Sequence, residues 1–382
     1  MNRPLRVGFV LHVMQVAGAE VLVREMIRRL GNRIVPTIFC LDSIGRIGEE
    51  LQREGVDLVC FDRKPGRDWS VSLRMVKAIR ERRLDILHAH QYTPFFYAAL
   101  AKPLCPRPPK LILTEHGRHY PDTVSPTRRA VNRLVLDRFA DAVTACCHFS
   151  ARGLSRNDGF AGGRIEIIEN GIEVDRYGID ADRRQLKLRL GLEPDRRFII
   201  HVARHHPVKD QATLLRGFAL AAPALPDVDL LMVGDGPLRS ELEDLARELR
   251  IHHRVNFLGI RSDIAELMRT AEVFALTSLS EAASLTLLEA MASGLPAVVT
   301  DVGGNGEIIR QEREGLLFPR GDATGCATAF RRLFQDPEWA AELGATGRNR
   351  IGKHYRLKRT VDRYFDLYGR LMGIRTTAIT GP

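Results

Sequence analysis

Short runs of β-branched and other apolar residues alternate with longer amphipathic stretches along almost the whole chain, and this alternation limits the fold more than any other feature. Thirteen runs have the length and composition of strands, and a helical stretch follows most of them. Strands that alternate with helices form βαβ units, in which neighbouring strands are parallel. Because thirteen strands exceed one ordinary sheet, the pattern predicts an α/β protein with two doubly wound domains.

The expected strands form a group of seven and a group of six. The first group is 7–13, 35–41, 56–61, 86–88, 111–113, 142–145 and 165–168. The second is 198–202, 229–233, 255–258, 273–276, 297–300 and 315–318. Helices are expected at 19–30, 125–139, 210–221, 238–249 and 285–292. The turn residues Glu169-Asn170-Gly171 separate the two groups, and we therefore expect domains over residues 1–172 and 173–354.

The composition excludes several classes of protein. The 382 residues are 45% hydrophobic and 27% charged, which is typical of a globular chain. No run approaches the ~20 apolar residues that a membrane-spanning helix needs, and the apolar start is interpreted as a strand rather than a signal peptide. Six cysteines without C-x-x-C spacing argue against a zinc site and against a disulfide framework. We therefore expect a protein of the reducing cytoplasm.

The net charge of +10 lies mostly in the first half of the chain. The basic clusters are Arg24, Arg28 and Arg29; Arg74, Lys77, Arg80, Arg82 and Arg83; and Arg128, Arg129, Arg133 and Arg138. Each has the spacing of a solvated helix face. Together they would also suit a basic surface that meets anionic lipid headgroups or an anionic acceptor. Nucleic acid is not expected as a partner, because no zinc knuckle, basic zipper or aromatic RNP-like strand is present.

The segment 277–306 holds two glutamates, Glu281 and Glu289, eight positions apart. They can serve one site if Glu281 lies in the loop after a strand and Glu289 in the first turns of the next helix. The start of that helix, Ser284, Leu285, Thr286 and Leu287, would then offer backbone N–H groups to a phosphate. Glu289 would bind ribose hydroxyls and Glu281 a sugar. In the alternative interpretation, Thr286 and Glu289 form a capping box and Glu281 is a solvated loop acid.

Arg204 and Lys209 follow the first expected strand of the second domain. Two cations at the carboxyl end of a strand suit a diphosphate, because arginine offers a planar fork and lysine a mobile point charge. A solvated basic loop is the alternative. The neighbouring His205 and His206 lack a third ligand at metal spacing, so no metal site is expected.

Other candidates lie where expected strands end. Gly18 would let the backbone approach a phosphate, or would simply form the turn. The segment Thr114-Glu115-His116-Gly117 directly follows the strand at 111–113, and His88 and His90 end the strand before it. Because ligands of open parallel sheets bind beyond the carboxyl ends of the strands, histidines there are candidates for a site in the cleft between the domains.

Two further candidate segments, both in the second domain, also lie where expected strands end. Gly234-Asp235-Gly236-Pro237 is a tight turn and a candidate nucleotide contact, and Leu258 ends another strand where its backbone would meet a base. No G-x-G-x-x-G or P-loop motif is present, so a dinucleotide cofactor is not expected.

These pieces, in this order, resemble the retaining glycosyltransferases of family four, which have the GT-B fold of two Rossmann-like domains facing across a cleft. The resemblance covers nearly the whole chain. It rests on the Gly18-Ala19-Glu20 turn, the His116 segment, Glu169-Asn170-Gly171-Ile172-Glu173, Arg204 with Lys209, Gly234-Asp235-Gly236-Pro237, and Glu281 and Glu289 followed by Gly303-Gly304. It also implies that a C-terminal helix at about 355–373 packs back on the first domain.

The resemblance implies a role for each candidate. The second domain would bind a nucleotide-sugar and the first an acceptor. Arg204 and Lys209 would neutralise the leaving diphosphate in place of a metal. Glu289 would hold the ribose and Glu281 the donor sugar. The remaining implied contacts are His116 with the donor sugar near the reacting carbon, Gly18 with the distal phosphate, Gly234 and Leu258 with the donor, and Arg118 and Tyr120 with the acceptor.

The implied activity is a metal-independent, retaining transfer of a hexose-type sugar to a lipid-linked or saccharide acceptor in cell-surface or exopolysaccharide synthesis. No cofactor and no dedicated protein base are expected. Where relatives have Glu-Gly, this chain has Glu281-Ala282-Ala283-Ser284, which changes the wall beside the donor sugar. We expect a UDP-sugar first and a GDP-sugar second, and a cytoplasmic enzyme on the inner face of the membrane. A sugar phosphorylase, a sugar-nucleotide epimerase and a non-catalytic binding partner remain the alternatives.

Overall fold

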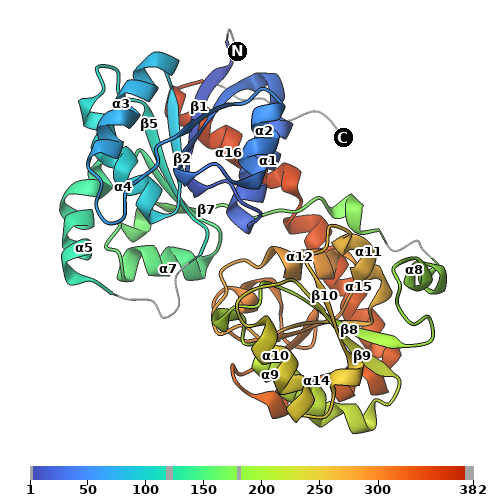
Figure 1. Cartoon of the computed structure of the whole chain (residues 1–382). Coiled ribbons are helices and arrows are strands. Elements are labelled where there is room, and N and C mark those ends of the chain that lie inside the picture. The colour runs from blue at the N-terminus through green and yellow to red at the C-terminus, as the bar shows by residue number, and fades with distance from the viewer. Residues whose placement is uncertain (1–2, 118–123, 179–181, 375–382) are drawn as a thin grey trace. The chain divides into compact units, whose positions relative to one another are not determined.

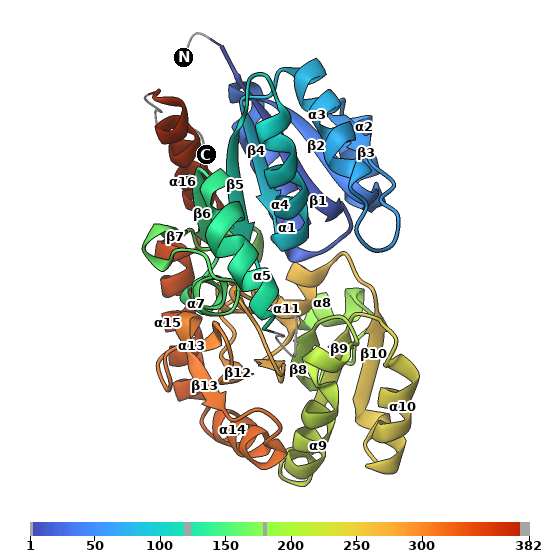
Figure 2. The ribbon, with the colours of Figure 1, turned by 90° about the vertical axis from the view of Figure 1, so that its left-hand side faces the viewer.

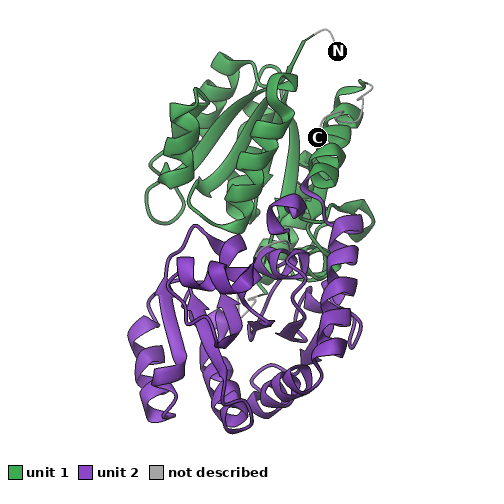
Figure 3. Ribbon diagram, turned by 90° about the vertical axis from the view of Figure 1, so that its right-hand side faces the viewer, with its two compact units in different colours: residues 1–170, 358–382 green, residues 171–357 purple. Residues whose placement is uncertain are grey.

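A computed structural model describes residues 3–117, 124–178 and 182–374. The chain forms two compact units, one of residues 1–170 with 358–382 and one of residues 171–357 (Figure 3). The divisions therefore fall after residues 170 and 357, where the sequence placed them after 172 and 354. In the described part of the chain, no helix is long and apolar enough to cross a membrane.

The first unit is built on a seven-stranded parallel sheet with helices on its faces (Figure 1). Its strands are β1 (Leu5–Val13), β2 (Ile34–Ser43), β3 (Asp57–Cys60), β4 (Ile86–His90), β5 (Lys110–Glu115), β6 (Ala142–Ala145) and β7 (Ile165–Ile167). Its helices are α1 (Gly18–Leu30), α2 (Gly45–Arg53), α3 (Ser70–Arg82), α4 (Tyr92–Ala101), α5 (Pro126–Val131), α6 (Asp137–Phe139), α7 (His148–Arg156) and α16 (Leu357–Met372). The strand order β3-β2-β1-β4-β5-β6-β7 is that of a doubly wound domain.

The second unit repeats the plan with six parallel strands in the order β10-β9-β8-β11-β12-β13. They are β8 (Arg197–Val202), β9 (Val228–Val233), β10 (Val255–Gly259), β11 (Val273–Leu276), β12 (Ala297–Thr300) and β13 (Gly315–Phe318). The helices are α8 (Arg183–Arg189), α9 (Gln211–Ala221), α10 (Arg239–Glu248), α11 (Ile264–Thr270), α12 (Leu285–Ala292), α13 (Asn305–Ile308), α14 (Ala323–Gln335) and α15 (Pro337–His354). The predicted α/β class with two doubly wound parallel sheets is confirmed.

Alternate residues of β8 show why a central strand of a parallel sheet has a continuous apolar run in its sequence. Phe198 and Ile200 pack into the core on one face of the sheet, and Ile199 packs into the core on the other face. Successive side chains of a strand point to opposite faces, and helices cover both faces of this sheet, so Phe198, Ile199 and Ile200 are apolar without alternation. Burial on both faces fixes β8 in the middle of the unit.

One expected helix is irregular. The stretch predicted at 125–139 consists of α5, a π-helical turn over Asn132–Leu136, and α6. The side chain of Asn132 is buried at this turn, where its amide donates to the Asp158 carbonyl at 2.8 Å and its oxygen accepts from the Tyr92 hydroxyl at 2.8 Å. The wider turn accommodates a buried polar side chain that a regular α-helical pattern does not reveal.

Helix α16 belongs to the first unit although it follows the second in sequence. The Tyr368 hydroxyl lies 2.7 Å from Nδ1 of His88 on β4, and Thr360 donates to the Glu169 carbonyl at 2.8 Å. Tyr364 and Tyr368 are fully buried. The chain therefore passes from the first unit to the second near residue 170 and returns near residue 357.

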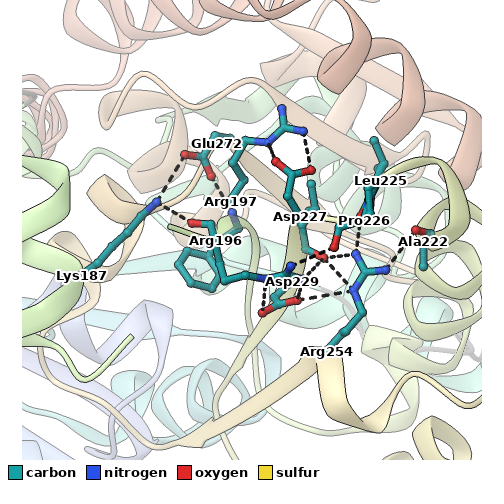
Figure 4. A network of polar contacts seen from close by, with 12 residues as sticks. Lys187, Arg196, Arg197, Ala222, Leu225, Pro226, Asp227, Asp229, Arg254 and Glu272 are labelled. Atoms are coloured by element: carbon teal, nitrogen blue, oxygen red, sulfur yellow. Dashed lines mark hydrogen bonds and ion pairs between the residues drawn. The ribbon is translucent and has the colours of Figure 1, made fainter. Parts of the chain in front are cut away.

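At the amino ends of its strands, the sheet of the second unit carries a network in which cations face carboxylates (Figure 4). Arg197 binds Asp227 at 2.6 Å, Arg196 binds Asp229, and Lys187 lies 3.8 Å from Glu272. Arg254 donates to the Val228 and Ala222 carbonyls. The network satisfies backbone groups where β8 and β9 begin.

Candidate active site

The second unit brings Lys209 and Glu281 together. Lys209 follows β8 and Glu281 follows β11, which are neighbours in the sheet, and the ammonium lies 2.5 Å from Oε1 of the carboxylate. The Ser278 hydroxyl donates to the same oxygen at 2.6 Å. The Glu281 side chain is 9% exposed, so a cation and a hydroxyl compensate a largely desolvated carboxylate.

Backbone contacts fix the loops that carry this pair. The Leu279 N–H donates to the Val208 carbonyl at 2.8 Å, and the Thr277 hydroxyl donates to the Asp210 carbonyl at 2.8 Å. In a third contact, the Gly304 N–H donates to the Glu281 carbonyl at 3.0 Å. Three loops at the carboxyl ends of β8, β11 and β12 therefore hold one another in place.

Gly303 permits the third of these contacts. Its φ is +57°, and a Cβ built on it would lie 1.7 Å from the Glu281 carbonyl oxygen. No side chain fits in that space, so glycine is required both for the backbone conformation and for the close approach. The sequence motif Gly303-Gly304 thus positions the backbone of Glu281.

Glu289 lies on α12, and its hydrogen-bond partner is Tyr177, which lies before α8. The Tyr177 hydroxyl donates to the Glu289 carboxylate, which lowers its pKa, but burial acts more strongly and raises the pKa of Glu289 to about 7. The same pairing, with burial as the larger cause, raises the pKa of Tyr177. Glu289 is therefore a half-buried carboxyl group that is partly protonated near neutral pH.

The capping-box interpretation of Thr286 and Glu289 is wrong. Ser284 is the N-cap of α12, and its hydroxyl accepts from the Leu287 N–H at 3.4 Å. Glu289 is the fifth residue of the helix, too far along to reach the N-cap. The Leu287 N–H already donates to the Ser284 hydroxyl. Of the helical residues predicted as phosphate donors, Leu285 and Thr286 therefore keep a backbone N–H that neither the helix nor its cap uses.

Burial of Glu289 predicts a pH-dependent stability. Since the folded pKa of about 7 lies above the ordinary value of 4.5, ionisation of the folded protein is penalised, and stability falls as pH rises from 4.5 to 7. Glu289→Gln removes this loss, which is on the order of 3 kcal/mol above pH 7. We expect the unliganded variant to unfold at higher urea concentration than the wild type at pH 8 and to match it near pH 4.5. The exposed Glu248→Gln, on α10, is the control; an equal gain at both pH values would contradict the assignment.

Arg204 is the second residue after β8 and its side chain is exposed, while the turn beside it is tightly packed. Gly234 has a φ of +127°, and a Cβ there would lie 2.1 Å from the Ala203 carbonyl oxygen. A Cβ on Gly236 would lie 2.3 Å from the His205 carbonyl oxygen. The Gly234-Asp235-Gly236 segment is therefore the tight turn that the sequence predicted, and it packs closely against the backbone on both sides of Arg204. Leu258 lies near the end of β10, where it packs against the core.

In the first unit, His90 and His116 lie at the carboxyl ends of the neighbouring strands β4 and β5. Nδ1 of His90 is 2.7 Å from Nε2 of His116, so one ring donates and the other accepts. Burial lowers the pKa of His116 to about 4 and that of His90 well below its ordinary value, so both rings are neutral. Nε2 of His116, the residue for which the resemblance implies a contact with the donor sugar, is engaged by His90.

Other predicted residues of the first unit are placed as follows. Gly18 is the first residue of α1. Arg118 and Tyr120 lie outside the described residues. Across the described ranges, no three His, Cys, Asp or Glu side chains gather as a metal site would require.

The sequence alone did not identify Tyr177 or Ser278 as part of the site. Ser278 lies three residues before Glu281, a spacing at which a hydroxyl can reach the carboxylate, and this signal could have found it. Tyr177 ends a short 3₁₀ turn far from Glu289 in sequence, and no periodicity connects them.

Residues 182–350 match the family described as Glycosyl transferases group 1, and residues 16–176 match Glycosyltransferase Family 4. N-acetyl-alpha-D-glucosaminyl L-malate synthase of Bacillus anthracis is 32% identical over 80% of this chain and 79% of its own. UDP-Gal:alpha-D-GlcNAc-diphosphoundecaprenol alpha-1,3-galactosyltransferase of Escherichia coli is 25% identical over 79% of each chain. The solved structure of HepE of Anabaena in complex with UDP has a TM-score of 0.84 and 21% identity over 96% of this chain and 100% of that one.

The fold and these matches define the class of the protein, a GT-B glycosyltransferase. The chain belongs to glycosyltransferase family four, and its second unit carries the match to the group 1 family. The resemblance drawn from its motifs is confirmed.

Proposed function

We propose that this protein transfers a hexose-type sugar from a nucleotide-diphosphate sugar to a lipid-linked or saccharide acceptor, with retention of configuration and without a metal. The observation that carries the proposal is the arrangement of Arg204 and Lys209 after β8, with Lys209 2.5 Å from Glu281. A guanidinium and an ammonium at the carboxyl end of a central strand suit a leaving diphosphate, whose charge they would stabilise.

The other residues to which we assign a role also lie in the second unit. Glu289, held by Tyr177, would accept hydrogen bonds from the ribose, and the N–H groups of Leu285 and Thr286 would meet a phosphate. Glu281 would bind the donor sugar. We assign no protein base, because in retaining transfer the leaving phosphate can take the acceptor proton.

The comparisons support a UDP-sugar as the first donor to test, and we propose a GDP-sugar as the second. The neighbouring structure of HepE holds UDP, and the Escherichia coli relative is named for UDP-Gal and for an acceptor on diphosphoundecaprenol. We infer that the acceptor here is a lipid-linked or free saccharide and that transfer takes place at the cytoplasmic face of the membrane.

The test is a thermal-shift series with UDP, GDP and ADP, their sugars and inorganic phosphate, each with and without EDTA. Ligand at ~100 times its Kd stabilises a protein by ~2.7 kcal/mol, and we expect this shift with UDP, unchanged by EDTA. Arg204→Ala is expected to remove the shift. Arg216→Ala, an exposed arginine on α9 of the same unit, is the matched control and should keep it. A response to phosphate alone would instead indicate a phosphorylase, and dependence on a metal would overturn the metal-independent mechanism.

A further inference from the structure

The first unit contains a cavity of about 830 Å³ at the amino-terminal edge of its sheet. It is formed where β1, β4 and β5 begin and where α3 and α16 end. Figure 2 shows the start of β1 and the end of α16 at the same end of this unit. His90 and His116 lie at the opposite edge of the same sheet, so the cavity is not part of the site described above.

The cavity is strongly basic. Its charged lining consists of the cations Arg3, Arg6, Arg80, Arg83, Arg107 and Lys110 and the single carboxylate Asp85. Asp85 is fully engaged, because it accepts from both terminal nitrogens of Arg3, at 3.0 and 2.8 Å, and from the Arg6 N–H at 2.9 Å. Lys110 binds Asp141 at 3.1 Å. Among the described residues, Arg80, Arg83 and Arg107 have no carboxylate partner.

The cations at the corresponding edge of the second unit are paired within the protein. Each strand-edge cation in that network faces a carboxylate or a backbone carbonyl: Arg196 with Asp229, Arg197 with Asp227, Lys187 with Glu272, and Arg254 with the Val228 carbonyl. The basic face of α1 is paired as well, since Arg28 binds both Glu50 and Glu54 at 2.5 Å. The cavity thus differs from the corresponding edge of the second unit, where the cations of the network are paired.

Two of the unpaired arginines have a backbone conformation that is either restricted or energetically unfavourable. Arg107 lies between Pro106 and Pro108, whose fixed φ angles reduce the conformational freedom of the loop and pre-organise the side chain. Arg83 ends α3 in the left-handed conformation with a φ of +51°, a position where glycine is favoured. Like charges gathered in this way repel one another, and a bound anion would relieve the repulsion.

The floor of the cavity is apolar. Ile79, Leu84 and Cys105 are buried there, and Leu371 and Met372 at the end of α16 are half-buried. A small inorganic anion would use only the rim. A cationic rim over an apolar floor matches a ligand that joins phosphoryl groups to an apolar portion.

We propose that this cavity is a second binding site, for a phosphoryl-bearing ligand with an apolar portion, and that it is separate from the nucleotide-sugar site of the second unit. The phosphoryl groups bind Arg80, Arg83 and Arg107. The source of these groups is either a soluble phosphate ester or a lipid headgroup, which present the same chemistry to the arginines.

The first experiment titrates inorganic tripolyphosphate by calorimetry into proteins that all carry Arg204→Ala, so that the proposed donor site is weakened throughout. We expect Arg83→Gly and Arg107→Gln each to weaken binding about tenfold, because each removes one charged hydrogen-bond donor. Arg83→Gly suits the left-handed backbone, so the folded state is kept. Arg53→Gln, which removes an exposed arginine on α2, is the control and should bind like the parent. Equal binding by all four proteins, or no binding by the parent, would overturn the proposal.

The second experiment distinguishes the two sources. Vesicles of phosphatidylglycerol are sedimented with the parent, Arg83→Gly and Arg107→Gln proteins, with tripolyphosphate as competitor. Vesicle binding that falls in both variants and with the competitor assigns the site to a lipid headgroup. Vesicle binding that is the same in all three proteins, together with weakened tripolyphosphate binding, assigns it to a soluble phosphate ester. Because the readout is binding to the first unit, loss of the proposed donor site in the second would not mimic either result.

Discussion

Replacing Lys209 with methionine is expected to lower turnover at least ~100-fold with whichever nucleotide-sugar the binding series identifies. Methionine keeps most of the length of the side chain and removes the charge that would stabilise the leaving diphosphate. It also leaves Glu281, 9% exposed, with Ser278 as its remaining side-chain partner, which we expect to cost on the order of 2 kcal/mol of stability. The measurements are kcat and the urea midpoint of the purified variant.

A double variant separates these two effects. In Lys209→Met/Glu281→Gln, the neutral amide can keep the Ser278 contact without burying an unpaired charge, so the stability of the single variant should be largely recovered. Turnover should stay as low as in Lys209→Met, since the cation is still absent. If turnover returned together with stability, Lys209 would act only by positioning Glu281, and the proposed role at the diphosphate would be wrong.

The pairing of Lys209 with Glu281 also shows which contacts can be predicted from the sequence. The two residues are 72 positions apart, but each follows a strand, and the two strands are neighbours in the sheet. Once the strands are identified from their β-branched runs, parallel topology brings their carboxyl ends to one edge. The same logic placed His90 and His116 at the ends of β4 and β5. Residues that follow regular strands are therefore predictable from the pattern.

Contacts from irregular segments were not predictable in this way. Tyr177 reaches Glu289 from a 3₁₀ turn that carries no hydrophobic period, and the π-helical turn at Asn132 depends on a buried amide that local propensity does not reveal. The capping-box interpretation of Glu289 failed for another reason. Two hydroxyl residues, Ser284 and Thr286, both suit an N-cap, and only the position of the first helical residue, Leu285, decides between them.

Gly303→Ala is expected to be among the most damaging single-methyl changes in the second unit. The added Cβ would lie 1.7 Å from the Glu281 carbonyl oxygen and 2.9 Å from its carbon, and a backbone oxygen cannot rotate away as a side chain can. The loop of Glu281 must shift, and the hydrogen bond from the Gly304 N–H to that oxygen is lost. A displacement of ~1 Å at a reacting group costs ~100-fold in rate, so turnover should fall by at least that factor.

Gly321→Ala is the matched control, because it separates the clash from the cost of the backbone conformation. Gly321 has a φ of +74°, and nothing in the described chain lies within 4 Å of the Cβ position. Its replacement should cost only the ~1 kcal/mol of a left-handed alanine and leave turnover unchanged. Gly303→Ala should lose about 2 kcal/mol more, which is the cost of overpacking. Because the two variants share the φ penalty, the difference between their urea midpoints measures the close approach of the two loops. Equal midpoints, or a Gly303→Ala protein with full turnover, would mean that Glu281 does not depend on this contact for its position.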